Sequence, residues 1–167
     1  MLERFSGSEI ITLGIEIEKN GRDFYQTLAG QLRSSSVKEV LKFLADEEEK
    51  HINVFKKILA EADKFGEPAL LSDEYLGYMS SLADNYVFTQ KDKGREIAQA
   101  IATDEKAIDM GMGFEKDSIL FYEGMKKTVA ESQAKIVDEL IREEQKHFRK
   151  LVDLKRQLPF DLKAKSK

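Results

Sequence analysis

The chain has only two histidines, and each of them follows a glutamate by three residues. The pairs are Glu48 with His51 and Glu144 with His147. On an α-helix, three residues turn the chain by about 300° and advance it by about 4.5 Å, so both side chains project toward a shared point. A carboxylate and an imidazole placed in this way can bind one metal ion. Because the chain has no cysteine, any metal must be bound by oxygen and imidazole ligands.

Two further glutamates have a matching relation to these pairs, since Glu18 lies 30 residues before Glu48 and Glu115 lies 29 residues before Glu144. All four fall on apolar helical stripes, where an unpaired carboxylate is strongly disfavoured. Two divalent ions would balance the four negative charges. Imidazole with carboxylate suits iron or manganese, and zinc remains an alternative. The predicted ligands of two metal ions are Glu18, Glu48, His51, Glu115, Glu144 and His147.

The segments around these residues repeat within the chain. GIEIEKNGRDFY, which begins at Gly14, aligns with GMGFEKDSILFY, which begins at Gly111. EEEKH at 47–51 aligns in the same way with EEQKH at 143–147. We therefore interpret the chain as a duplicated pair of helices, in which the two glycines allow close helix packing or leave room for a substrate.

Tyrosines and flanking charges accompany the predicted ligands. Tyr25 and Tyr122 each lie seven residues after the glutamate of their helix. Two turns further along the helix, a tyrosine hydroxyl can hydrogen-bond a ligand from a neighbouring helix. An ordinary core tyrosine without this role explains the position equally well. Glu47 and Glu143 flank the ligands and are interpreted as surface charges that could replace one of them.

The expected fold is all-α, because apolar residues recur at three- to four-residue steps in four long segments. Ser36 and Glu39 form a capping-box pattern that opens the second segment. We expect Met112 and Ile119 to face inward with the other apolar residues of the third. One domain covers 1–167, with helices at about 8–32, 36–62, 103–128 and 132–157, and a crossover at about 63–102 that contains short helices at about 73–84 and 95–102.

Composition excludes several classes of protein. The formal net charge is -4, and acidic and basic residues are interleaved along the chain, so no nucleic-acid partner is expected. No stretch approaches the roughly 18 apolar residues that a membrane span requires. We expect a cytoplasmic protein with no membrane partner.

Four long helices with one long crossover match a ferritin-like up-down-down-up four-helix bundle. The segments EKNGRDFY, EEEKH, EKDSILFY and EEQKH resemble the ferritin-like diiron-carboxylate proteins, and in particular their rubrerythrin-like branch. The resemblance implies that Glu48 and Glu144 bridge two iron ions. It also implies that Glu18 and Glu115 are terminal ligands and that each histidine completes the shell of one ion.

The same resemblance implies a rubrerythrin-like peroxidase or oxidoreductase, which responds to oxidative stress by reducing peroxide or dioxygen. Rubrerythrins usually carry one more glutamate three residues after the third-helix ligand, where this chain has Ser118. They also carry a four-cysteine rubredoxin domain, which a chain without cysteine cannot form. A separate electron donor, such as a rubredoxin-type protein, is therefore expected, and a homodimer is compatible with the resemblance.

The sequence is also compatible with two other functions. Ferritin-like iron storage with ferroxidase activity needs a similar ligand set, but only a few residues follow Pro159, too few for the fifth helix of cage-forming ferritins. A structural bundle without metal is the third reading.

Overall fold

The computed structural model describes residues 6–65 and 71–159. Every regular element in this part of the chain is helical. Residues 66–70 of the predicted crossover, and both ends of the predicted domain, lie outside the described residues. No helix in the described part is both long and apolar enough to cross a membrane. The long helices are α1 Gly7–Gln31, α2 Ser35–Phe65, α5 Asp104–Met125 and α6 Glu131–Gln157.

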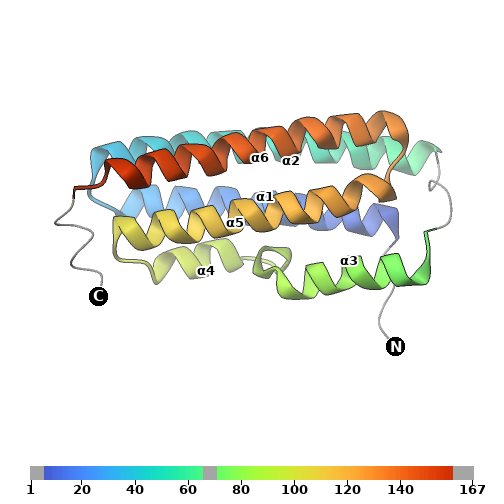
Figure 1. The fold of residues 1–167 in the computed structure, drawn as a ribbon, viewed down its shortest axis with the longest axis horizontal. Coiled ribbons are helices and arrows are strands. Elements are labelled where there is room, and N and C mark those ends of the chain that lie inside the picture. The colour runs from blue at the N-terminus through green and yellow to red at the C-terminus, as the bar shows by residue number, and fades with distance from the viewer. Residues whose placement is uncertain (1–5, 66–70, 160–167) are drawn as a thin grey trace.

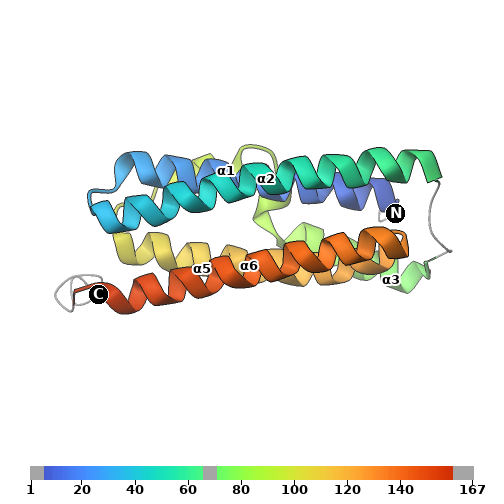
Figure 2. The same cartoon turned by 90° about the horizontal axis from the view of Figure 1, so that it is seen from above.

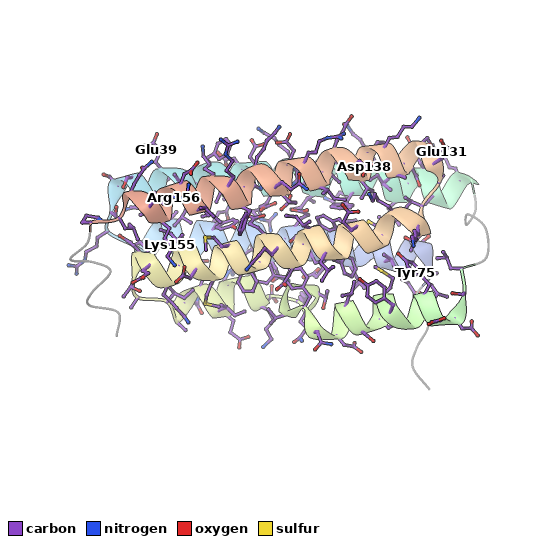
Figure 3. The ribbon with its side chains drawn as sticks, viewed as in Figure 1. Glu39, Tyr75, Glu131, Asp138, Lys155 and Arg156 are labelled. Atoms are coloured by element: carbon purple, nitrogen blue, oxygen red, sulfur yellow. The ribbon has the colours of Figure 1, made fainter. Side chains whose placement is uncertain are left out.

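These four helices form two antiparallel pairs that face each other. One layer contains α1 and α2, and the other contains α5 and α6 (Figure 2). Along the bundle, α1 and α6 run one way while α2 and α5 run the other way, which confirms the up-down-down-up order (Figure 1). The connection from α2 to α5 must therefore travel the length of the bundle. Charged side chains such as Glu39, Glu131 and Arg156 point away from the bundle (Figure 3).

Side-chain caps begin two of the long helices. At α1 the backbone N–H of Glu9 donates to the Ser6 hydroxyl at 3.2 Å, and the N–H of Ser6 donates to the Glu9 carboxylate at 2.6 Å. This is a capping box that the sequence patterns did not lead us to predict. At α5 the N–H of Lys106 donates to the Thr103 hydroxyl at 3.3 Å. Each cap satisfies N–H groups that have no partner within the helix.

The predicted capping box at Ser36 and Glu39 is wrong. Helix α2 begins at Ser35, and the N–H of Lys38 donates to the carbonyl of Ser34 at 2.9 Å. Ser36 therefore lies within the first turn, where its hydroxyl is 3.1 Å from that of Ser34. Three successive serines offer the same chemistry, and the sequence pattern alone selected the wrong one.

The core lies between the two layers, and most of the predicted inward-facing apolar residues are buried there. Met112 and Ile119 of α5 are exceptions, because both are only half-buried. Their neighbours Gly111 and Ser118 are buried instead. At these two points of α5 a small residue is therefore buried, and the bulkier neighbour lies at the edge of the stripe.

Over residues 71–102, the described part of the crossover, there are three short helices, which are α3 Asp73–Asn85, a 3-10 helix at Val87–Thr89, and α4 Lys93–Gln99. The first agrees with the predicted helix at about 73–84. The last begins two residues before the predicted segment at 95–102 and ends three residues before its end. Asp92, with φ 60°, is the left-handed residue that precedes it.

Buried hydrogen bonds hold the crossover against α1. The Asn20 amide donates to the carbonyls of Phe88 and Gln90, both at 2.7 Å, and its oxygen accepts the N–H of Gly94 at 2.8 Å. The backbones approach so closely here that a Cβ atom on Gly94 would lie 2.0 Å from the Asn20 carbonyl oxygen. Asn20 thus fixes the middle of the crossover two residues from Glu18.

Helix α3 packs against α5 at the other end of the crossover. The Tyr75 hydroxyl donates to the carbonyl of Gly124, and Tyr75 lies between the two helices (Figure 3). A Cβ atom on Gly124 would meet the Met79 sulfur at 2.4 Å. Glycine at this position allows the close approach of α3.

Candidate metal centre

Six polar side chains meet inside the bundle, and they are the six that the sequence singles out. Helices α1 and α5 each supply one glutamate, and α2 and α6 each supply one glutamate and one histidine. Because each of these residues lies on the buried face of its helix, the side chains point into the space between the layers. All are at most 4% exposed: Glu18, Glu48, His51, Glu115, Glu144 and His147.

Three carboxylates from three helices surround the Nδ1 atom of His51. It lies 2.8 Å from Glu144 Oε1, 3.2 Å from Glu48 Oε2 and 3.5 Å from Glu18 Oε2. One ligand atom from each of the four residues lies within 4.8 Å of the other three. Four donor atoms this close can share one metal ion, and we call this place the His51 position.

A matching set surrounds the Nδ1 atom of His147. It lies 3.7 Å from Glu48 Oε1 and 3.8 Å from both Glu115 Oε2 and Glu144 Oε2. Ligand atoms of these four residues also lie within 4.8 Å of one another. This is the His147 position, and its nitrogen-to-oxygen distances are longer than those at the His51 position.

Glu48 and Glu144 belong to both positions. Each turns one carboxylate oxygen toward His51 and the other toward His147. Glu18 and Glu115 each approach one histidine only. The imidazole rings stack with centroids 5.4 Å apart and an interplanar angle of 15°. This is the geometry of two adjacent metal positions joined by two carboxylates.

The cluster has buried polar atoms that no hydrogen bond satisfies. They are Glu48 Oε2, His51 Nδ1, Glu144 Oε1 and both ring nitrogens of His147. The Nδ1 atoms lie close to carboxylate oxygens, yet their geometry is not that of hydrogen bonds. Buried polar groups in proteins almost always have partners, and lone pairs that converge without protons between them need a cation. The residues present therefore fit a pair of metal ions.

Without cations the cluster must take up protons to reduce its charge. Burial raises the pKa of Glu48, and the negative charges of Glu144 and Glu18 raise it further. Burial followed by the charges of Glu144 and Glu48 does the same for the pKa of Glu115. Burial also opposes ionisation of Glu144, but interactions with His51 outweigh it and lower the Glu144 pKa to about 2. Two divalent ions would neutralise four ionised carboxylates.

Two tyrosines connect the helix pairs across the cluster. The Tyr25 hydroxyl on α1 donates to Glu115 Oε1 on α5 at 2.5 Å, and the Tyr122 hydroxyl on α5 donates to Glu18 Oε1 on α1 at 2.6 Å. Burial raises the pKa of both hydroxyls, so they stay protonated as donors. Each leaves the other oxygen of its glutamate facing a histidine. Each hydroxyl thus donates to a predicted ligand from a neighbouring helix, which is the hydrogen bond that the sequence suggested.

A cavity of about 10 Å³ adjoins the cluster. Among its lining residues are Gly21 of α1, Ser118 of α5 and Tyr86 from the crossover. Sequence reasoning did not assign Gly21 or Tyr86 to the site. Gly21 is the equivalent of Ser118 in the internal repeat, and that alignment could have found it. Tyr86 lies between short helices in a segment with no long periodic pattern, so no sequence signal marked it.

Glu47 lies nearer the cluster than its flanking position suggested. One of its oxygens and one nitrogen of each histidine lie within 4.8 Å of one another. Glu47 also accepts a hydrogen bond from Lys50, and its repeat equivalent Glu143 accepts one from Lys146 at 2.6 Å. Both flanking glutamates are therefore held by the lysine one turn further along.

Comparison with known proteins places this geometry in a family. A crystal structure of a ferritin-like diiron-carboxylate protein from Thermotoga maritima is similar to the chain, with a TM-score of 0.67 and 26% sequence identity. The match covers 92% of this chain and 97% of that one. No curated protein matches the chain. The family model for rubrerythrin matches residues 9–155, which include all six predicted ligands, and the chain belongs to the rubrerythrin family.

Proposed function

We propose that this rubrerythrin-family chain is a diiron-carboxylate oxidoreductase that reduces peroxide or dioxygen with electrons from a separate donor. The observation that carries the proposal is the pair of four-residue positions that share Glu48 and Glu144. A small cavity beside them reaches Glu18, Glu48 and Glu115. Two adjacent redox-active ions with room for a small ligand suit a two-electron reaction.

Iron bound at both positions would supply the electrons and the Lewis acidity that cleave an O–O bond. In this reaction hydrogen peroxide accepts two electrons and two protons and gives two molecules of water. An external carrier, such as a rubredoxin-type protein, would return the electrons, because the chain itself has no cysteine for an iron–sulfur centre. Manganese fits the same donor set, and zinc fits it without redox chemistry.

The residues of the chain have separate parts in this reaction. Glu48 and Glu144 set the separation of the two positions, because each carboxylate extends to both. Tyr25 and Tyr122 hold one oxygen of the terminal carboxylates and so limit the directions in which the other can point. The buried aromatic residues around the cavity, Tyr86 and Phe88 among them, keep bulk water from the cluster.

The test begins with total metal analysis of protein purified without oxygen, followed by loading with ferrous iron. We expect two iron ions per chain and consumption of hydrogen peroxide when reduced rubredoxin is supplied. Zinc-loaded protein is the matched control, because it keeps the charge of the cluster but cannot transfer electrons. Iron-loaded protein that oxidises and accumulates iron, yet consumes no peroxide with any reductant, would support storage instead. A chain that binds no metal would support the structural reading.

A further inference from the structure

The cavity lies on one side of the cluster. Among the described residues, Glu18, Glu48 and Glu115 line it, whereas Glu144 and the two histidines do not. A ligand in the cavity therefore approaches the metal positions from the side away from the imidazole rings. Its volume of about 10 Å³ leaves room for a small molecule only.

Two small residues make this space. Gly21 and Ser118 occupy equivalent positions, each three residues after the glutamate of its helix. A Cβ atom on Gly21 would lie 3.4 Å from Glu48 Cγ, so the missing side chain exposes the Glu48 carboxyl to the cavity. Ser118 is 6% exposed and carries only a hydroxymethyl group. Larger side chains at these two positions would fill the cavity.

Tyr86 lines the cavity from outside the four-helix bundle. It follows the last residue of α3, and its ring stacks on Phe88 with centroids 5.7 Å apart and an angle of 20°. Its hydroxyl donates to the carbonyl of Phe114 at 3.0 Å and lies 2.9 Å from the Ser118 hydroxyl. The side chain is 4% exposed. Ring packing and two hydrogen bonds thus hold it in one place.

The hydrogen bonds also determine which of the two hydroxyls is the donor. Tyr86 has one hydroxyl proton, and the Phe114 carbonyl accepts it. Ser118 must then be the donor in the bond between the two hydroxyls. The remaining lone pairs of both oxygens are acceptors.

We propose that Tyr86, held by Ser118, is a specificity-determining residue that limits the ligand at this site to the size of hydrogen peroxide or dioxygen and excludes organic hydroperoxides. The inference rests on the proposed peroxide reduction for its substrate class. The limit on ligand size rests on the cavity and on the packed ring of Tyr86, and it can be measured without turnover.

The first experiment measures ligand size by anion binding to cobalt(II)-loaded protein, whose visible spectrum changes when a ligand is added. The probes are azide, which is small, and butyrate, which carries an alkyl chain. We expect the parent chain to respond to azide and not to butyrate. Tyr86→Leu replaces the phenol ring with a shorter apolar side chain and so removes the far end of the ring and the hydroxyl. It should respond to butyrate with affinity raised by about 10-fold or more, which is the scale of discrimination that an apolar pocket gives for a single methylene group.

Three variants serve as comparisons. Tyr86→Phe keeps the ring and should still exclude butyrate. Tyr78→Ala changes a tyrosine of the same crossover that is 44% exposed and does not line the cavity, so it should respond to azide and exclude butyrate, as the parent chain does. Gly21→Ala adds a methyl group in ordinary contact with Glu48 and should weaken azide binding. It tests the cavity even if Tyr86→Leu does not fold.

The second experiment compares turnover of hydrogen peroxide and tert-butyl hydroperoxide by iron-loaded protein. The kcat/KM for tert-butyl hydroperoxide, divided by that for hydrogen peroxide, should rise in Tyr86→Leu and stay near the parent value in Tyr78→Ala. Butyrate binding to the parent chain, or a folded, metal-loaded Tyr86→Leu that still excludes it, would overturn the inference. An absence of peroxide turnover with the expected anion binding would overturn only the proposed reaction. A chain that takes up no cobalt would overturn both.

Discussion

At the scale of single residues, His51 and His147 are the only nitrogen ligands that the chain offers to its two metal positions. We expect His51→Ala and His147→Ala each to lower the bound metal from two ions toward one and to abolish peroxide reduction. The helical circular dichroism should stay unchanged, because the apolar stripes remain. Metal analysis of each purified variant gives the measurement.

Lys50→Ala and Lys146→Ala are matched controls for the histidine variants. Each lysine precedes a histidine by one residue and is exposed at the surface, so both variants should retain two metal ions. Histidine variants that reduce peroxide at the parent rate would contradict the assignment of these residues as ligands.

The two tyrosines should respond alike, because each hydroxyl holds the terminal carboxylate of the opposite helix. Tyr25→Phe and Tyr122→Phe should each lower metal affinity or turnover by about 10- to 100-fold, which is typical for a partner of a ligand rather than for a ligand itself. Competition with a chelator would measure the affinity. Tyr78→Phe, at an exposed position, should change neither quantity, and equal effects of all three variants would contradict the role given to the two hydroxyls.

The residues closest to the chemistry were the most predictable from sequence. Glu48, His51, Glu144 and His147 stand out because the only two histidines share a helical spacing with glutamate, and the internal repeat adds the other two glutamates. Tyr86 was not predictable in this way. It reaches Ser118 across 32 residues, and no local pattern encodes a contact between a crossover and a bundle helix.

At the scale of elements, the crossover depends on close backbone contact at Gly94. Gly94→Ala would place a Cβ atom 2.0 Å from the carbonyl oxygen of Asn20, and neither backbone can move without losing the hydrogen bonds around Asn20. We expect the variant to lower the free energy of unfolding by about 2 kcal/mol or more. Urea denaturation followed by circular dichroism would measure it.

Gly77→Ala is the control for this substitution. Gly77 lies within α3, and a Cβ atom there would meet nothing within 4 Å. Alanine should therefore stabilise the helix by about 0.5–1 kcal/mol. If both variants changed stability by the same amount, the backbone contact at Gly94 would not be the cause.

Among the elements, the long helices were easier to predict than the short ones. Their apolar stripes extend over many turns, so an error at one residue does not hide the pattern. The predicted capping residue of α2 was wrong, because neighbouring serines can cap a helix equally well and the sequence does not distinguish them. The shift of α4 has a similar origin, since its start follows a left-handed residue at Asp92 that no periodic pattern marks.

At the scale of the whole molecule, metal ions bound at the two proposed positions would hold the two layers together at their centre. Without metal, the raised pKa values of Glu48 and Glu115 mean that the folded chain binds more protons than the unfolded chain above pH 4.5, the ordinary value for glutamate. The free energy of unfolding of metal-free protein should therefore fall as the pH rises from there. Burial disfavours the charged form of His51, but the carboxylates of Glu18 and Glu144 outweigh it and raise the pKa of His51, which acts in the same direction above its ordinary value of 6.5. Burial lowers the pKa of His147, which acts in the opposite direction, but only below 6.5.

Metal binding has the opposite dependence on pH, because it requires ionised carboxylates and neutral imidazoles. We expect metal-loaded protein to have the higher Tm, and the difference in Tm from metal-free protein to widen between about pH 5 and pH 8. Differential scanning calorimetry of both forms would measure it. A constant difference over this range, with metal content verified after each scan, would show that the buried carboxylates do not control the stability of the metal-free form.

The division of ligands between the two helix pairs has a consequence for the order of folding. Each antiparallel pair can form early, because its contacts are local in sequence, whereas docking the two pairs must first overcome the loop-closure entropy of the crossover. The α1–α2 hairpin contains three ligands of the His51 position and lacks Glu144, and the α5–α6 hairpin contains three of the His147 position and lacks Glu48. No half-folded intermediate can therefore present a complete site, and we expect tight metal uptake only by chains in which the hairpins have docked.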